Sequence, residues 1–201
     1  KRYEAERISL KPWPCIRHLH TALTAVLGLV AGHKLAFDDI AEVVLSVGQV
    51  NRDRCRPVAL GSSPANHIDL AGNMHFAVAA AIRHRGIPLE LYHHTKPADD
   101  VIANAMPKVR WQYDAALNGH TFEPSVVEIT TTGRQRFTAR CEVALGHPDN
   151  PMTLEQRVGK FLDCASSAAN PVPRAKAMQI VDAVTGLDKS NDIQSLMRLL
   201  A

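Results

Sequence analysis

Residues 124–143 have the sequence PSVVEITTTGRQRFTARCEV, and this stretch does most to define the predicted fold. β-Branched residues are frequent on the N-terminal side of Gly133, and polar and apolar residues alternate after it, which is typical of two strands joined by a tight turn. A short connection of this kind turns the chain back beside itself. The stretch therefore predicts a β-hairpin.

Three further strands are predicted upstream of the hairpin. Residues 5–10 alternate as a half-buried strand does, residues 40–47 are rich in apolar and β-branched side chains, and residues 109–113 alternate again. The two prolines in residues 11–14 end the first strand, because a residue before proline is biased away from helix. Residues 51–64 lack any periodicity, so we expect an irregular loop there.

Helical periodicity accounts for most of the remaining chain. In residues 18–31 the apolar side chains recur at helical spacing, and Gly32 is placed to end that helix. Thr153 and Gln156 have the spacing of a capping box at the start of another helix. The other predicted helices cover residues 66–85, 98–106, 174–184 and 191–200, and the capped one continues to about residue 167.

The order of these elements indicates an α+β fold, with an antiparallel sheet, packed helices and a C-terminal helical tail. Residues 1–146 form the α+β domain in this prediction, and residues 147–201 form the tail. The tail has no sheet of its own and needs an apolar surface to pack on. Since the chain starts at Lys1 without methionine, we expect it to be a fragment whose N-terminal part supplies that surface.

The composition excludes several classes of function. The chain has 201 residues, 46% of them hydrophobic, which is enough for one or two globular cores. The net charge of +3 is scattered rather than gathered in a basic stripe, so no nucleic-acid partner is expected. No apolar run approaches the roughly 18 residues that a bilayer span requires, and no secretory signal is evident, so we expect a cytoplasmic protein without a membrane partner. The four cysteines form no C-x-x-C pair and are expected to be reduced thiols.

Three segments carry a resemblance to a known family. Residues 11–20, KPWPCIRHLH, resemble the Lys-Pro-Tyr-Pro-Cys-Cys-Arg-x-x-His signature of the MmgE/PrpD family. Residues 73–81, NMHFAVAAA, are similar to the family's Ser-x-x-Tyr-Ala-Val-Ala helix, and residues 146–161 are similar to its Gly-x-x-x-Asn-Pro…Lys-Phe element. The three segments occur in family order and span most of the chain.

The sequence departs from the family pattern at three positions. Ile16 replaces the second cysteine of the signature, and Trp13 is the aromatic residue after the first proline. Phe76 stands where members usually have tyrosine. Loss of that hydroxyl removes a possible proton donor or substrate hydrogen bond, so the reaction of this protein can differ from those of known members.

The resemblance implies both an architecture and a chemistry. Members include 2-methylcitrate dehydratase, cis-aconitate decarboxylase and iminodisuccinate epimerase, which act on small polycarboxylates without a metal or other cofactor. In the family a large all-helical domain precedes the α+β domain, the last helices pack back on it, and the active site lies between the two domains. Members are commonly homodimers. We therefore expect a lyase or isomerase that removes a proton next to a carboxylate and is incomplete in this fragment.

Four residues are the candidate site. Such chemistry needs cations that hold the acid groups and a positioned base. Lys11, presented by the prolyl turn, and His20, whose imidazole exchanges protons near neutral pH, are the catalytic candidates. Arg17 offers a planar fork for a carboxylate and, with His75 beside Phe76, is a candidate for substrate binding.

Spacing alone favours ordinary structural roles for these residues. Lys11 would be a solvated turn lysine, Arg17 the partner of a surface acid, and His20 a histidine satisfied by the backbone. His75 would equally be a hydrogen-bonded histidine between helices. The resemblance reverses this preference for Lys11 and His20, and makes the two interpretations of Arg17 about equal.

Other chemistries receive less support. The pairs His18-x-His20 and His93-His94 lack the i, i+4 spacing of a zinc helix and have no acidic or thiol ligand at a characteristic offset, so no metal is predicted. Cys15 is expected to be a packed thiol rather than a nucleophile. Two rival functions stay open: a catalytically silent fragment that serves as an interaction module, and a carboxylate-binding regulator.

Overall fold

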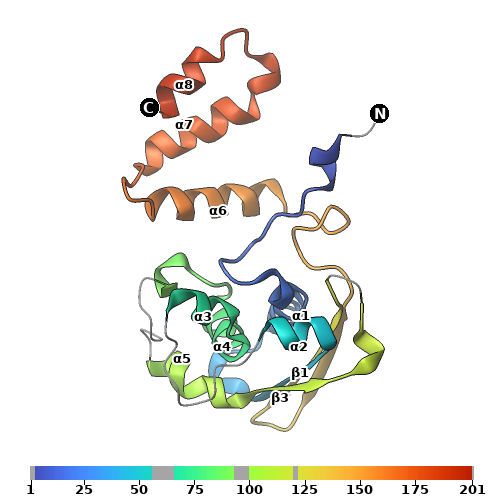
Figure 1. The fold of residues 1–201 in the computed structure, drawn as a ribbon. Helices are drawn as coiled ribbons and strands as arrows, with labels where there is room; N and C mark the ends of the chain where they lie inside the picture. Colours follow the sequence, from blue (N-terminus) through green and yellow to red (C-terminus); the bar gives the residue numbers. More distant parts are fainter. Residues whose placement is uncertain (1–2, 56–65, 93–99, 120–121, 201) are drawn as a thin grey trace. The chain divides into compact units, whose positions relative to one another are not determined.

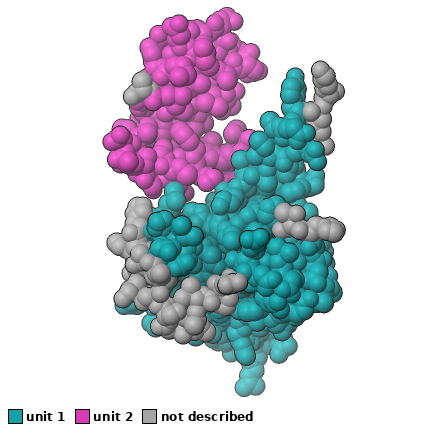
Figure 2. All heavy atoms as spheres, viewed as in Figure 1, with its two compact units in different colours: residues 1–151 teal, residues 152–201 magenta. Residues whose placement is uncertain are grey.

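The computed structural model describes residues 3–55, 66–92, 100–119 and 122–200. The chain divides into two compact units, residues 1–151 and residues 152–201 (Figure 2). Within the described ranges, no helix is both long enough and apolar enough to cross a membrane.

The first unit is built on a four-stranded mixed sheet in the order β2-β1-β3-β4. β1 pairs antiparallel with β3, and β3 pairs antiparallel with β4, which confirms the predicted hairpin. β1 pairs parallel with β2, so the prediction of a purely antiparallel sheet is wrong. The physical reason is the long connection between them, because helices in it return the chain to the same end of the sheet. The strands are β1 (Ile40–Val47), β2 (Val109–Tyr113), β3 (Ser125–Thr131) and β4 (Arg136–Cys141).

Two helices cover the sheet and enclose the core. α1 (His20–Gly32) contacts β3 and β4, α4 (Met74–His84) contacts β2, and the two helices contact each other (Figure 1). The strand positions alternate between buried and partly exposed along β1 and β3, as expected when one face is packed. The centre of the core is formed by side chains from both helices and both central strands: Leu23, Val26, Leu45, Phe76 and Ile129.

The alanine-rich stretch forms two helices instead of the single predicted one. α3 (His67–Gly72) ends at Asn73, and α4 begins directly after it. The side-chain oxygen of Asn73 accepts a hydrogen bond from the main-chain N–H of Phe76 at 3.1 Å, so this residue caps α4. The break follows from asparagine's preference for the cap position over a helix interior.

Two other segments differ from the prediction. Residues 5–10 form no strand, because Glu4–Arg7 is a 3-10 helix and the main-chain N–H of Leu10 makes a single bond, to the carbonyl oxygen of Gly146 at 2.8 Å, rather than joining a strand ladder. Residues 51–54 are not loop but belong to α2 (Gln49–Arg54), and residues 56–65 lie outside the described residues. The remaining helices of this unit include α5 (Asp100–Ala105) and the 3-10 turns Arg17–Leu19, Phe37–Asp39, Leu89–Tyr92, Met106–Lys108 and Ala115–Leu117.

The second unit is a group of three α-helices. α6 (Leu154–Ser166) starts at the predicted capping box, in which the side chain of Thr153 accepts from Gln156 N at 3.1 Å. α7 (Arg174–Thr185) contacts both α6 and α8 (Gln194–Leu200). The predicted helices of the C-terminal part are therefore confirmed.

Candidate functional site

The bend formed by residues 11–20 brings two of the predicted catalytic groups to one thiol residue. The Nζ of Lys11 donates to the carbonyl oxygen of Cys15 at 3.0 Å. The Sγ of Cys15 lies 3.5 Å from Nε2 of His20, the first residue of α1. The ring of Trp13 packs on the His20 ring with 5.3 Å between centroids. Lys11, Cys15 and His20 are thus joined through a prolyl bend that the sequence predicted.

The two groups differ in exposure. Lys11 is exposed, whereas the His20 side chain is 0% exposed beneath Trp13. Burial raises the pKa of the Cys15 thiol to about 12, although the charges of Lys11 and Arg17 act in the opposite direction. Cys15 is therefore a neutral packed group at physiological pH.

Arg17 is held at the edge of the same bend. Its Nη1 lies 3.5 Å from the carbonyl oxygen of Leu10 and 3.4 Å from that of Leu145, and its guanidinium lies 5.5 Å from the ring centroid of Phe122. Burial lowers the pKa of Arg17, partly offset by Cys15. The side chain stays cationic and has a fixed direction.

His75 lies in a different environment from these three residues. It is in α4, 5% exposed, and its Nδ1 is 2.7 Å from the carbonyl oxygen of Val109 in β2. Its neighbour Phe76 is fully buried and packs edge-on against Tyr92, with 5.7 Å between ring centroids. The described contacts of His75 therefore connect a helix to the sheet, and they do not connect it to the bend.

A cleft of about 240 Å³ lies beside the bend. It is lined by residues of the 3-10 turn Arg17–Leu19, of α1 and α2, and of the segments that flank β3 and β4. Its polar lining includes Arg17, His18, Asn51, Glu123, Glu142 and His147. Lys11, His20 and His75 are not among the residues that line it.

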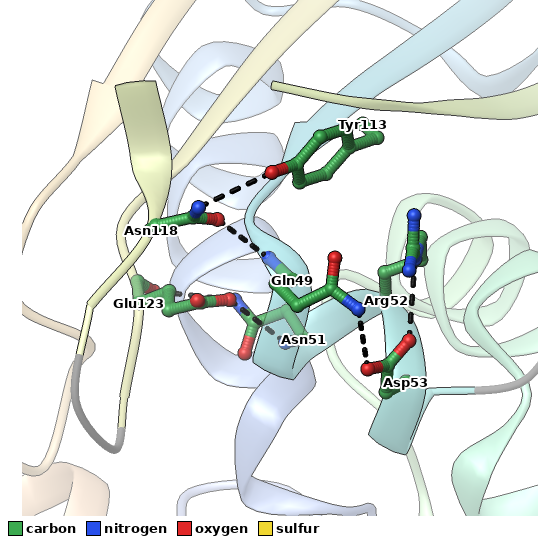
Figure 3. Close-up of polar contacts among 7 residues, drawn as sticks. All are labelled: Gln49, Asn51, Arg52, Asp53, Tyr113, Asn118 and Glu123. Carbon is green, nitrogen blue, oxygen red and sulfur yellow. Dashed lines mark hydrogen bonds and ion pairs between the residues drawn. The ribbon is translucent and has the colours of Figure 1, made fainter. Parts of the chain in front are cut away.

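Glu123 fixes one wall of the cleft through four hydrogen bonds, and Figure 3 shows it beside one of the partners, Asn51. Its carboxylate accepts from the main-chain N–H of Asn51 at 2.8 Å and of Gly119 at 3.1 Å. Its carbonyl oxygen accepts from Thr21 Oγ1 at 3.0 Å and from Asn51 Nδ2 at 3.3 Å. Gly48 makes room for the carboxylate, because a Cβ there would lie 2.6 Å from Glu123 Oε2. This wall is therefore closely packed.

A second polar network continues from this wall toward the sheet edge (Figure 3). Asn118 accepts from Gln49 N at 2.9 Å and donates to the hydroxyl of Tyr113 at 3.2 Å. Gln49 Nε2 donates to Asp53 at 2.6 Å, and Arg52 lies 5.0 Å from the Tyr113 ring centroid. These contacts anchor α2 to β2 and the segment after it.

His18 stays neutral on the cleft wall. Burial lowers the pKa of its imidazole, the charge of Arg54 lowers it further, and Glu123 opposes both. The sequence indicated His18 only as half of a rejected metal pair, and it gave no sign of Asn51 or Glu123 as site residues. Asn51 was the first residue of the predicted loop 51–64, Glu123 was given no assignment, and nothing local showed that the two would be buried together.

The described residues contain no group of three histidine, cysteine or acidic side chains arranged to hold a metal ion. His93 and His94, which formed the second candidate metal pair, lie outside the described residues. The groups that the structure does bring together are an ammonium, a guanidinium and imidazoles. These groups can bind carboxylates and transfer protons.

The thiols are expected to differ sharply in reactivity. Burial raises the pKa of both Cys15 and Cys55 to about 12, so at pH 8 almost no thiolate is present at either residue. We expect a disulfide reagent to label exposed Cys164 first and partly buried Cys141 more slowly. Cys15 and Cys55 should react only after unfolding, as followed by alkylation and mass spectrometry. Labelling of Cys15 at the rate of Cys164 in the native protein would contradict this packing.

A mixed sheet covered by helices, with a basic prolyl bend and a polar cleft beside it, defines the chain as an α+β domain with a candidate anion-handling site. The model of the MmgE/PrpD C-terminal domain matches residues 13–186. The chain therefore belongs to the MmgE/PrpD family, which confirms the resemblance found in the sequence. No curated protein matches the chain.

Proposed function

We propose that this chain is part of a cofactor-independent lyase or isomerase that acts on a small di- or tricarboxylate. The reaction begins with removal of a proton next to a carboxylate, and elimination, decarboxylation or reprotonation follows. Candidate reactions are those of 2-methylcitrate dehydratase, cis-aconitate decarboxylase and iminodisuccinate epimerase. Family membership supports this class, since the family includes such lyases.

The observation that carries the proposal is the link from Lys11 through Cys15 to His20, with distances of 3.0 Å and 3.5 Å. In this bend an exposed ammonium and a buried imidazole both contact Cys15. Lys11 is the group that meets the substrate directly. His20 exchanges a proton with the substrate only after Trp13 moves off its ring.

The proposed binding roles rest on different grounds. Arg17 is held by two carbonyl oxygens, so its remaining N–H groups can present a fixed surface to a carboxylate. His75 keeps its proposed substrate-binding role through the resemblance alone, because its hydrogen bond connects it to β2. A homodimer, a cytoplasmic location and packing of the C-terminal helices on an all-helical domain also stay predictions.

The full burial of His20 favours one rival, a carboxylate-binding module without turnover. An assay in D₂O separates the two functions. The protein in its complete natural reading frame is incubated with 2-methylcitrate, cis-aconitate or iminodisuccinate, and the reaction is followed by NMR. We expect consumption of at least one compound, with loss or deuteration of a C–H group next to a carboxylate. Binding without any exchange or product would support the module, and neither binding nor exchange would contradict both functions.

A further inference from the structure

Two buried polar atoms on the cleft wall have unused hydrogen-bonding capacity. Among the residues that the structure describes, Oδ1 of Asn51 and Nδ1 of His18 have no hydrogen-bond partner. Asn51 is 1% exposed, and its main-chain N–H and its side-chain Nδ2 both donate to Glu123 (Figure 3). Because buried polar atoms are costly without a partner, these two atoms indicate a molecule that completes the cleft.

The charges around the cleft restrict what that molecule can be. Arg17 supplies a guanidinium, whereas Glu123 and Glu142 supply two carboxylates, of which Glu142 is paired with Arg140. A dicarboxylate would bring a second negative charge beside these acids. A molecule with one carboxylate and one ammonium instead satisfies the guanidinium and the free acceptor of Asn51.

We infer that the cleft is a binding site for a small amino acid, with its carboxylate at Arg17 and its ammonium at Oδ1 of Asn51. The volume of about 240 Å³ admits a molecule of this size. Phe122, Val143 and Ala144 line the cleft as well, and they provide an apolar surface for a short aliphatic side chain.

This site and the proposed reaction use different residues, apart from Arg17. The proposed proton transfer uses Lys11 and His20, and neither residue lines the cleft. Arg17 belongs to both, so the test relies on Asn51 instead. The amino-acid site can therefore fail while the proposed reaction stands, and the reverse also holds.

Titration with three molecules that share one carbon skeleton tests whether the cleft binds an amino acid. L-Valine carries both charged groups, isovalerate lacks the ammonium, and 2-hydroxyisovalerate has a hydroxyl in its place. By calorimetry on the full chain we expect saturable binding of L-valine, at least about tenfold tighter than that of isovalerate. In NMR spectra the side-chain amide of Asn51 should shift during the titration. Absence of L-valine binding, or equal or tighter binding of either analogue, would overturn the inference.

Three variants locate the binding at Asn51. We expect Asn51→Leu to lose L-valine binding at least about tenfold, and Asn51→Asp to keep it, since aspartate retains an acceptor oxygen and adds a favourable charge. Asn118→Leu is the matched control, because Asn118 also bonds to α2 but does not line the cleft. Circular dichroism confirms that each variant is folded. Undiminished binding by folded Asn51→Leu, or loss with folded Asn118→Leu equal to that with Asn51→Leu, would overturn the site.

A fourth variant separates this site from the proposed reaction. Lys11→Met should bind L-valine as the natural protein does, because Lys11 makes no part of the cleft. Loss of L-valine binding in a folded Lys11→Met protein would show that the amino acid occupies the bend, and would overturn the assignment to the cleft.

Discussion

Replacing Lys11 by methionine is expected to lower kcat/KM at least about 100-fold on whichever polycarboxylate the protein converts. Methionine keeps the length of the side chain but can neither transfer a proton nor attract a carboxylate. Lys11 is the exposed member of the pair that meets at Cys15, so removal of its ammonium takes away the group proposed to contact the substrate. Steady-state kinetics of the purified variant measure the effect.

Lys108→Met is the matched control for this experiment. Lys108 is also exposed, and its Nζ also donates to a main-chain carbonyl oxygen, that of Ile40, at 3.1 Å. It lies outside the bend, so its loss should leave kcat/KM within about twofold of the natural value. If the two variants have equal activity and equal melting temperatures, Lys11 has no catalytic role.

The second large effect concerns Gly146. Its φ of +89° is in the region that glycine adopts most readily, and a Cβ there would lie 2.1 Å from the main-chain oxygen of Leu10. This contact cannot be relieved by a rotating side chain. Gly146→Ala is therefore expected to lower the free energy of unfolding by about 3 kcal/mol or more. It should also displace Leu145, whose carbonyl oxygen holds Arg17.

Urea unfolding followed by tryptophan fluorescence measures this change in the first unit, because both tryptophans, Trp13 and Trp111, lie there. Gly133→Ala in the hairpin turn is the control. The nearest atom to its added Cβ would be 3.8 Å away, so a change within about 0.5 kcal/mol is expected. Equal midpoints for the two variants would show that the segment around Gly146 can relax.

The parts of the fold that were predicted correctly are those with local signals. The hairpin, β1 and the capping box of α6 each follow from residue types within a few positions of one another. The parallel pairing of β1 with β2 was missed because strand direction depends on a connection that carries no such signal. The 3-10 helix Glu4–Arg7 was missed because alternation alone does not show whether a partner strand exists.

In the candidate site, too, the part predicted correctly is the part with a local sequence signal. The bend that joins Lys11 to His20 lies within ten residues and is visible as a motif. The cleft was missed because Asn51 and Glu123 are distant in sequence, and tertiary packing alone makes neighbours of them. The motif also grouped His75 with the bend, and the contacts observed for His75 lie at β2 instead.

The mixed sheet also determines the order in which the first unit can assemble. The turn between β3 and β4 closes a short loop, so this pair loses little chain entropy when it forms. The parallel ladder pairs Val43 with Val109. The segment between these residues must bring β2 back beside β1 before any hydrogen bond of this ladder can form. Nucleation is therefore expected at the hairpin of β3 and β4, whereas β2, an edge strand paired only with β1, is expected to be readily lost when the domain opens locally.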